Sequence, residues 1–199
     1  NIGHTRRINN KKNRTIMGAN IILKNFSNKV KVSDKKKLLE HVAKINSLES
    51  PKFFRSYKKN YKYSFNKKFI QKFKNINNIN IIGMGGSSLG TKAIYNFLIQ
   101  KIKKKITFSE NLNLKKQKKI KGLNIIVSKS GNTLETIVNF NTKFNNQDKN
   151  IFITEKTNNY LEKLANKLKS DVVEHKNFIG GRFSVLSEVG MLPAELMGL

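Results

Sequence analysis

Short apolar runs alternate with amphipathic segments along the chain from Ile79 onward. The runs are rich in Ile and Val, which is typical of strands that are buried on both faces of a sheet. Because strand, helix and strand follow one another repeatedly, the pattern predicts right-handed crossovers and an α/β fold with a doubly wound, mostly parallel five-stranded sheet flanked by helices. The predicted strands span residues 79–83, 105–109, 123–127, 150–154 and 171–175.

The segments between these runs carry apolar residues at the spacing that places them on one face of a helix. Such stripes occupy residues 89–102, 134–144 and 161–168. Upstream, apolar residues recur at helical spacing after Ser33, a candidate N-cap, and again at 69–73. We therefore expect residues 17–77 to form a helical N-terminal segment before a sheet domain at 78–199.

The first 16 residues are polar and basic and show no period. Met17 follows them and opens an apolar stretch, so we expect Met17 to be the natural start and residues 1–16 to be a disordered or non-native extension. The alternative is that residues 1–16 form a disordered basic arm of the protein itself.

Aromatic residues are interleaved with Lys and Arg55 between positions 53 and 65. Bases of single-stranded nucleic acid stack on aromatic side chains, so this stretch could form a platform for RNA. A packing surface for the domain that follows is the simpler interpretation, and we favour it.

The net charge changes this picture little. Forty Lys and Arg stand against 12 Asp and Glu, a formal net charge of +28 that invites a nucleic-acid interpretation. The excess is almost entirely Lys, spread through every segment with abundant Asn and Ile, as a bias toward A and T in the coding sequence would produce. A selected phosphate-binding face would use Arg as well, because only Arg binds bidentately. We expect no specific nucleic-acid partner.

The absence of Cys excludes disulfides and thiolate metal sites. No apolar run approaches the roughly 18 residues that a membrane span needs, and the basic, polar start lacks the apolar core of a secretory signal. We expect a cytoplasmic protein without a membrane partner.

The first candidate site is the loop after the first predicted strand, Gly-Met-Gly-Gly-Ser-Ser-Leu-Gly at 83–90. It does not match the dinucleotide fingerprint, because Ser88 stands at the third glycine position. It does not match a P-loop either, because Thr91 and Lys92 stand where Lys and a hydroxyl residue are needed. Its glycines and hydroxyls fit an anion site and a tight turn equally well.

The second candidate is the loop Ser-Lys-Ser-Gly-Asn-Thr at 128–133, after the third predicted strand. It offers three hydroxyls, one cation and the free backbone amides of a helix N-terminus, which suit a phosphate monoester without a metal. Thr133 could instead serve only as a helix cap. Two such loops at neighbouring strand ends, where doubly wound sheets bind ligands, favour a phosphate site.

The third candidate is Gly-Gly-Arg-Phe-Ser-Val-Leu-Ser at 180–187. Arg182 is the only Arg after Arg55 in a chain that otherwise uses Lys almost everywhere. We infer that Arg182 has a role that Lys cannot fill, because the guanidinium is planar and offers paired donors. The alternative is an ordinary surface Arg in a loop.

These three motifs, in this order and spacing, resemble the glucose-6-phosphate isomerase family and in particular its first sugar isomerase (SIS) domain. The resemblance runs from about residue 79 to 199 and fades toward the N-terminus. Gly-Gly-Arg-Phe-Ser is the most specific motif, whereas the serine-rich loop identifies only the superfamily. The resemblance implies that residues 78–199 are the first SIS domain, truncated before the second.

The resemblance also implies roles for individual residues. Arg182 would stabilise the enediolate, because negative charge develops on oxygen as a proton moves between C1 and C2. Ser130 stands where Thr is more frequent in the family, and a Gly-Asn pair follows where the family often has bulkier residues, which leaves fine substrate contacts open. The other implied contacts with the substrate and its phosphate come from Gly86, Ser87, Ser128, Lys129, Ser130, Thr133 and Gly181.

The family's proton-shuttling Glu and its His and Lys helpers lie beyond the Gly-Gly-Arg element. Glu195 is too close to that element to be the base, and His4, His41 and His175 match no family position. We therefore expect the N-terminal part of a longer cytoplasmic enzyme, inactive alone, that interconverts glucose 6-phosphate and fructose 6-phosphate in glycolysis and gluconeogenesis.

The family further implies a homodimer without a metal or nucleotide cofactor, and leaves open whether mannose 6-phosphate is accepted. Two alternatives remain. A non-catalytic sugar-phosphate-binding SIS domain is disfavoured by the Gly-Gly-Arg-Phe-Ser element. An RNA-binding protein rests only on the net charge and the aromatic stretch at 53–65.

Overall fold

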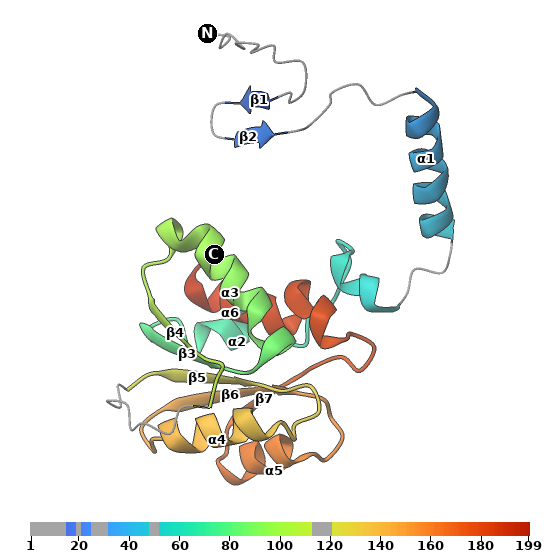
Figure 1. The fold of residues 1–199 in the computed structure, drawn as a ribbon. Helices are drawn as coiled ribbons and strands as arrows, with labels where there is room; N and C mark the ends of the chain where they lie inside the picture. The colour runs from blue at the N-terminus through green and yellow to red at the C-terminus, as the bar shows by residue number, and fades with distance from the viewer. Residues whose placement is uncertain (1–14, 19–20, 25–31, 48–51, 113–120) are drawn as a thin grey trace. The chain divides into compact units, whose positions relative to one another are not determined.

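A five-stranded parallel sheet forms the centre of the larger of two units in a computed structural model of the chain (Figure 1). The units are Asn1–Glu49 and Ser50–Leu199, so residues 50–77 belong to the same unit as the sheet. The structure describes residues 15–18, 21–24, 32–47, 52–112 and 121–199.

The smaller unit contains a two-stranded antiparallel sheet, β1 (Thr15–Gly18) and β2 (Ile21–Lys24), and the helix α1 (Val32–Ser47). The hairpin lies in a region for which the sequence pattern predicted only helix, and β1 begins inside the expected extension at 1–16. Two short apolar runs separated by two residues are a hairpin pattern. Ser33, the expected N-cap, lies inside α1. The rest of the expected extension, residues 1–14, lies outside the described residues.

The sheet has the order β4-β3-β5-β6-β7, and every neighbouring pair is parallel. This order confirms the predicted doubly wound topology: the chain steps to one side of β3 to form β4 and then crosses back to form β5 on the other side. Predicted and observed strand ends differ by at most one residue. The strands are β3 (Asn78–Ile82), β4 (Lys105–Ser109), β5 (Leu123–Val127), β6 (Lys149–Thr154) and β7 (Asp171–Glu174).

Helices cover both faces of the sheet (Figure 1). On one face lie α2 (Lys67–Gln71), α3 (Leu89–Leu98) and α6 (Glu188–Met197), and on the other lie α4 (Leu134–Lys143) and α5 (Tyr160–Lys167). Short 3-10 helices join these elements: η1 (Lys52–Tyr57), η2 (Gly85–Ser87), η3 (Ile99–Lys101) and η4 (Gly181–Leu186). None of the helices in the described part of the chain is long and apolar enough to cross a membrane.

The alternation of side chains along β5 explains the two layers. Ile125 points into one apolar core, which includes Leu192 of α6, whereas Ile126 points into the other, which includes Phe140 of α4. Each of these side chains is almost completely buried. Both faces of the strand are therefore apolar, as its Ile- and Val-rich sequence predicted.

Candidate functional site

The loops after β3, β5 and β7 lie at the same edge of the sheet, because parallel strands all end on one side. β3 and β5 are neighbours in the sheet, and the order in which the chain adds strands changes direction between them. Ligands of doubly wound folds bind at such a switch point. Their loops are close together: a Cβ atom on Gly83 would lie 3.1 Å from the carbonyl oxygen of Val127.

Two hydroxyls meet in the loop after β5. Ser128 is almost completely buried, and its Oγ lies 2.8 Å from Oγ1 of Thr133 and accepts a hydrogen bond from the amide of Gly131 at 3.2 Å. Thr133 is the N-cap residue of α4, but its side chain makes no capping hydrogen bond. Its hydroxyl thus faces Ser128, next to the first turn of a helix whose leading amides lack intrahelical partners.

Gly131 fixes the shape of this loop. Its φ of +67° lies in the left-handed region, and a Cβ atom there would sit 1.8 Å from Oδ1 of Asn159. Asn159 is itself held, because it caps α5 by accepting from the amide of Glu162 and donates to Oγ1 of Thr154 at 3.0 Å. Only glycine therefore fits at position 131.

Lys129 and Ser130, the other predicted phosphate ligands, lie on the same loop. Nζ of Lys129 donates to the carbonyl oxygen of Asn177 at 2.7 Å and lies 3.4 Å from Oε1 of Glu155. An ammonium group has three donors, so these contacts leave capacity for an anion. Ser130 is exposed, and its Oγ accepts from the amide of Asn132 at 3.4 Å. Through its hydrogen bond to Asn177, Lys129 also connects this loop to the loop that follows β7.

The first and third sequence motifs meet directly. A Cβ atom on Gly86 would lie only 2.4 Å from the carbonyl carbon of Gly181, so the two backbones touch. Oγ of Ser184 lies 2.6 Å from the carbonyl oxygen of Gly181 and 3.1 Å from that of Gly86. The structure thus brings together two elements that are about 95 residues apart in the sequence, as the two positions show.

The two serines of the first loop have different environments. Ser88 is completely buried and donates to Oε1 of Glu110 at 2.9 Å, and Lys92 pairs with the same carboxylate. The hydrogen bond from Lys92, with that from Ser88, lowers the pKa of Glu110. Ser87 is half-buried, and its hydroxyl forms no hydrogen bond with the residues that the structure describes. Ser87, the predicted ligand, is therefore the available hydroxyl of the pair.

Arg182 lies on η4, one residue after the Gly86–Gly181 contact. Its side chain is exposed, and it forms no ion pair with any residue in the described ranges. The guanidinium is therefore free to meet a negative charge at the edge of the sheet.

A hydrogen-bonded contact at the start of α6, the helix that follows η4, could not be predicted from the sequence. Glu188, the first residue of α6, is 0% exposed and accepts from the hydroxyl of Tyr61 at 2.9 and 3.0 Å and from the amide of Ser64 at 3.0 Å. Burial, and then the neighbouring Glu188 carboxylate, raise the pKa of Tyr61. The partners are more than 120 residues apart, so no local pattern could have revealed the pair.

His175, which the sequence analysis left without a role, is buried at the end of β7. Its Nδ1 lies 3.1 Å from the carbonyl oxygen of Lys176. Burial lowers the pKa of this imidazole, and the positive charge of Lys129 acts in the same direction. This environment therefore favours the neutral form of the ring.

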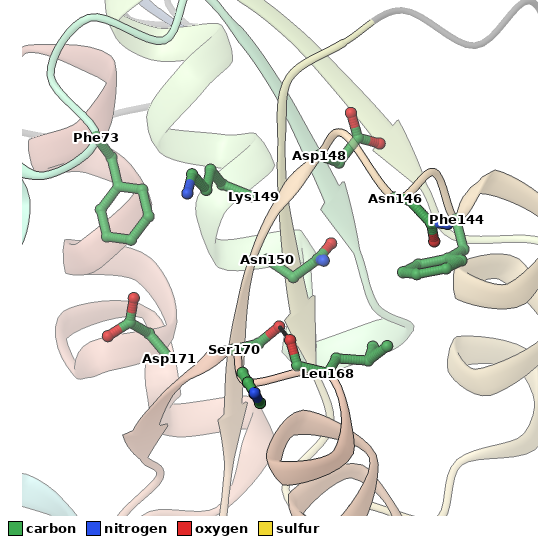
Figure 2. A pocket seen from close by; sticks show the side chains of 10 residues that line it. Phe73, Phe144, Asn146, Asp148, Lys149, Asn150, Leu168, Ser170 and Asp171 are labelled. Atoms are coloured by element: carbon green, nitrogen blue, oxygen red, sulfur yellow. Dashed lines mark hydrogen bonds between the residues drawn. The ribbon is translucent and has the colours of Figure 1, made fainter.

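A cavity of about 360 Å³ lies at the opposite edge of the sheet (Figure 2). Its lining includes Lys149 and Asp171, the first residues of β6 and β7, so it opens at the amino ends of the strands. Asp148, also in its wall, accepts from the amide of Gly122 and from Asn124 and so supports the sheet. We do not assign this cavity to the site, because the candidate loops all lie at the other edge.

The sheet order and the helices on both of its faces define a class, the doubly wound α/β domain of the SIS type. A crystal structure of a hypothetical protein from Thermus thermophilus has the same fold, with a TM-score of 0.61 at 21% identity over 83% of this chain and 45% of that chain. A family model described as phosphoglucose isomerase matches residues 2–198. The chain therefore belongs to the phosphoglucose isomerase family, which confirms the resemblance of its three motifs.

Curated relatives agree with this assignment. The glucose-6-phosphate isomerase of Methanocaldococcus jannaschii is 36% identical over 147 residues, which cover 65% of this chain and 36% of the relative. The glucose-6-phosphate isomerase of Campylobacter jejuni is 33% identical over 148 residues, which again cover 65% of this chain and 36% of the relative. The chain thus spans about a third of the length of these relatives.

Proposed function

We propose that this chain binds the phosphate group of a hexose 6-phosphate and serves the interconversion of glucose 6-phosphate and fructose 6-phosphate. The observation that supports this most strongly is the contact between Gly86 and Gly181 beside the paired hydroxyls of Ser128 and Thr133. The contact joins two of the three family motifs, and the third motif lies at the same edge of the sheet. Phosphate would lie against the loop at 128–133, with the sugar extending toward Gly86, Ser87 and Gly181.

In this arrangement Arg182 acts on the reacting end of the sugar. As a proton moves between C1 and C2, negative charge develops on the oxygens of the enediolate. A guanidinium fixed next to that charge stabilises the transition state more than the bound sugar, and so raises turnover rather than affinity. The absence of a competing ion pair among the described residues suits Arg182 to this role.

We propose that the base that moves the proton comes from sequence outside these 199 residues. Glu188 and Glu195 are the only carboxylates after Arg182. Glu188 is fully buried and already accepts hydrogen bonds from Tyr61 and Ser64. The carboxylate of Glu195 is exposed on α6 and forms no hydrogen bond or ion pair with the residues that the structure describes. The whole enzyme is proposed to act as a cytoplasmic homodimer.

Calorimetry with 6-phosphogluconate tests the phosphate site on the 199-residue chain itself. We expect weak binding that the double substitution Ser128→Ala and Thr133→Ala reduces by more than about tenfold, because each lost hydrogen bond to a charged group contributes about 1.5–3 kcal/mol. Thr142→Ala with Ser170→Ala is the matched control, since it removes two hydroxyls elsewhere in the fold. Equal affinity of the two variants would move the phosphate site away from this loop.

A non-catalytic sugar-phosphate-binding domain is the second candidate. Such a domain would bind 6-phosphogluconate in the same way. It would catalyse no isomerisation, however, so substitution of Arg182 would change no reaction rate. The position of Arg182 on η4, in contact with the first loop through Gly181, favours the isomerase.

A further inference from the structure

A cavity of about 340 Å³ lies between the segment 55–62 and the loop after β7. We call it the basic cavity, because its wall contains four cationic side chains and no carboxylate. None of its residues is among those proposed to bind the sugar phosphate, although Lys176 and Phe178 lie on the loop after β7, upstream of Gly181. The lining residues are Arg55, Lys58, Asn60, Tyr61, Lys62, Lys176 and Phe178.

The general excess of Lys in this chain does not explain the basic cavity. The cavity of Figure 2 carries two Asp and two Lys in its wall. A third cavity, of about 320 Å³ and lined by residues 155–157 and 174–178, carries two Glu and two Lys. Of these three cavities, the basic cavity alone has an excess of positive side chains in its wall. The excess is therefore a local feature.

Backbone geometry directs the cations to one side. The amide of Lys58 donates to the carbonyl oxygen of Arg55 at 3.2 Å, and the amide of Tyr61 donates to that of Lys58 at 3.0 Å. Side chains three residues apart are eclipsed in turns of this kind, so Arg55, Lys58 and Tyr61 line one wall. This wall belongs to the aromatic and basic stretch that the sequence analysis treated as a packing surface.

Two contacts hold the wall in place. The guanidinium of Arg55 lies 5.5 Å from the ring centroid of Phe178, a cation–π contact that favours the planar group of Arg. The hydroxyl of Tyr61 is engaged by the buried Glu188. Arg55 and Arg182 are the only two Arg residues after position 14. Position 55 therefore carries Arg although Lys would supply the same charge.

Three of the four cations lack an acidic partner among the described residues. Lys176 pairs with Glu174 at 2.8 Å. Arg55, Lys58 and Lys62 form no ion pair with any residue in the described ranges, and their mutual repulsion would be relieved by a bound anion. A volume of about 340 Å³ lies near the lower end of the range of small-molecule sites.

We propose that the basic cavity binds a small anion with two linked phosphate groups, either inorganic pyrophosphate or the diphosphate of a nucleotide. Two linked phosphates carry enough negative charge to match three uncompensated cations and can accept the paired donors of Arg55. Tyr61 and Phe178 supply an apolar wall on which a base could stack. This site does not depend on the proposed isomerase function.

Calorimetric titration of the 199-residue chain with pyrophosphate at about 150 mM salt, where the screening length is about 8 Å, tests the proposal. Arg55→Gln with Lys58→Gln is expected to weaken binding by about tenfold or more. Lys163→Gln with Lys167→Gln removes the same charge from exposed positions of α5 and should change the affinity by less than about twofold. Thermal melting of both variants checks that each is folded.

Two results would overturn the proposal. Equal losses in the two variants would show that pyrophosphate responds only to net charge. Loss of pyrophosphate binding in the Ser128→Ala, Thr133→Ala variant would place the anion in the loop at 128–133 instead. If that variant still binds pyrophosphate but no longer binds 6-phosphogluconate, the result supports two separate sites. The comparison of the Arg55, Lys58 variant with its control holds even if the isomerase proposal fails.

ADP and a single-stranded RNA of 12 nucleotides complete the test. ADP that binds at least about tenfold more tightly than pyrophosphate assigns a nucleotide, since stacking of a base on an aromatic ring contributes about 1–3 kcal/mol. Equal affinities assign the inorganic ion. RNA that displaces both ligands with an affinity that rises with its length would contradict a small-anion site.

Discussion

Arg182 shows how one residue can be singled out by composition and then by environment. In a chain with so little Arg, its presence after two glycines indicated a specific role, and its exposed, unpaired guanidinium among the described residues agrees with that interpretation. The role proposed for Arg182 requires donors in a fixed plane, which Lys does not have.

In an enzyme that contains this chain and the remaining family residues, Arg182→Lys should lower kcat by about 10–100-fold and change KM by less than about threefold. The reason is that the charge persists while the paired donors that we propose face the enediolate are lost. Steady-state kinetics in both directions measure this split. Near-normal turnover would remove Arg182 from the chemistry.

His175 makes stability depend on pH. Because burial lowers its pKa, the folded protein resists protonation while the unfolded chain, with an ordinary His pKa near 6.5, accepts the proton. The unfolded state therefore binds more protons below about pH 6.5, and the free energy of unfolding falls as the pH decreases from about 7 to 5.5.

The substitution His175→Gln should flatten this dependence, as measured by urea unfolding at several pH values. His41→Gln, at an exposed position on α1, is the control and should leave the slope unchanged. A slope that survives in His175→Gln would assign it to other groups.

At the scale of elements, the alternation of β3 to β7 with helices was predictable because each strand is buried on both faces and each helix has one apolar stripe. α6 was not predicted, since Pro193 lies inside it and its packing depends on distant partners, such as the hydroxyl of Thr91 that donates to the carbonyl oxygen of Val189 at 2.9 Å. The hairpin β1–β2 was missed as a short local pattern.

The loops of the candidate site could be located from the sequence in the same way as the strands. Strand ends located the loops, and hydroxyls and glycines suggested an anion. The contact of Gly86 with Gly181 and the engagement of Ser88 by Glu110 depend on tertiary structure, so the sequence could not distinguish Ser87 from Ser88 without the family resemblance.

The link from Tyr61 and Ser64 to Glu188 joins the N-terminal part of the larger unit to the helix that follows η4. Glu188→Ala should lower the free energy of unfolding by about 2–4 kcal/mol, because the half-buried hydroxyl of Tyr61 and the backbone amide of Ser64 both lose their acceptor. Urea unfolding measures the loss.

Glu195→Ala is the control for this prediction, because it removes an exposed carboxylate from the same helix and should cost less than about 0.5 kcal/mol. If the two variants were equally stable, Glu188 would not be the link between these elements.

For the whole molecule, we propose that the substrate-binding residues and the general base come from different parts of the enzyme. The residues that align with the relatives cover about a third of the relatives' length. This chain is proposed to hold the phosphate and stabilise the enediolate, and the base is proposed to come from further sequence. A positioned general base contributes about 10²–10⁴-fold to the rate, so its absence should be plain in an assay.

The most direct test compares the purified 199-residue chain with a fusion to the remainder of the Methanocaldococcus jannaschii relative, in an assay that couples fructose 6-phosphate conversion to glucose-6-phosphate dehydrogenase. We expect turnover by the fusion, loss of that turnover with Arg182→Ala, and a rate at least about 100-fold lower for the chain alone. Robust turnover by the chain alone that disappears with Arg182→Ala would place a base within these residues and would show that no further sequence is needed for the proton transfer.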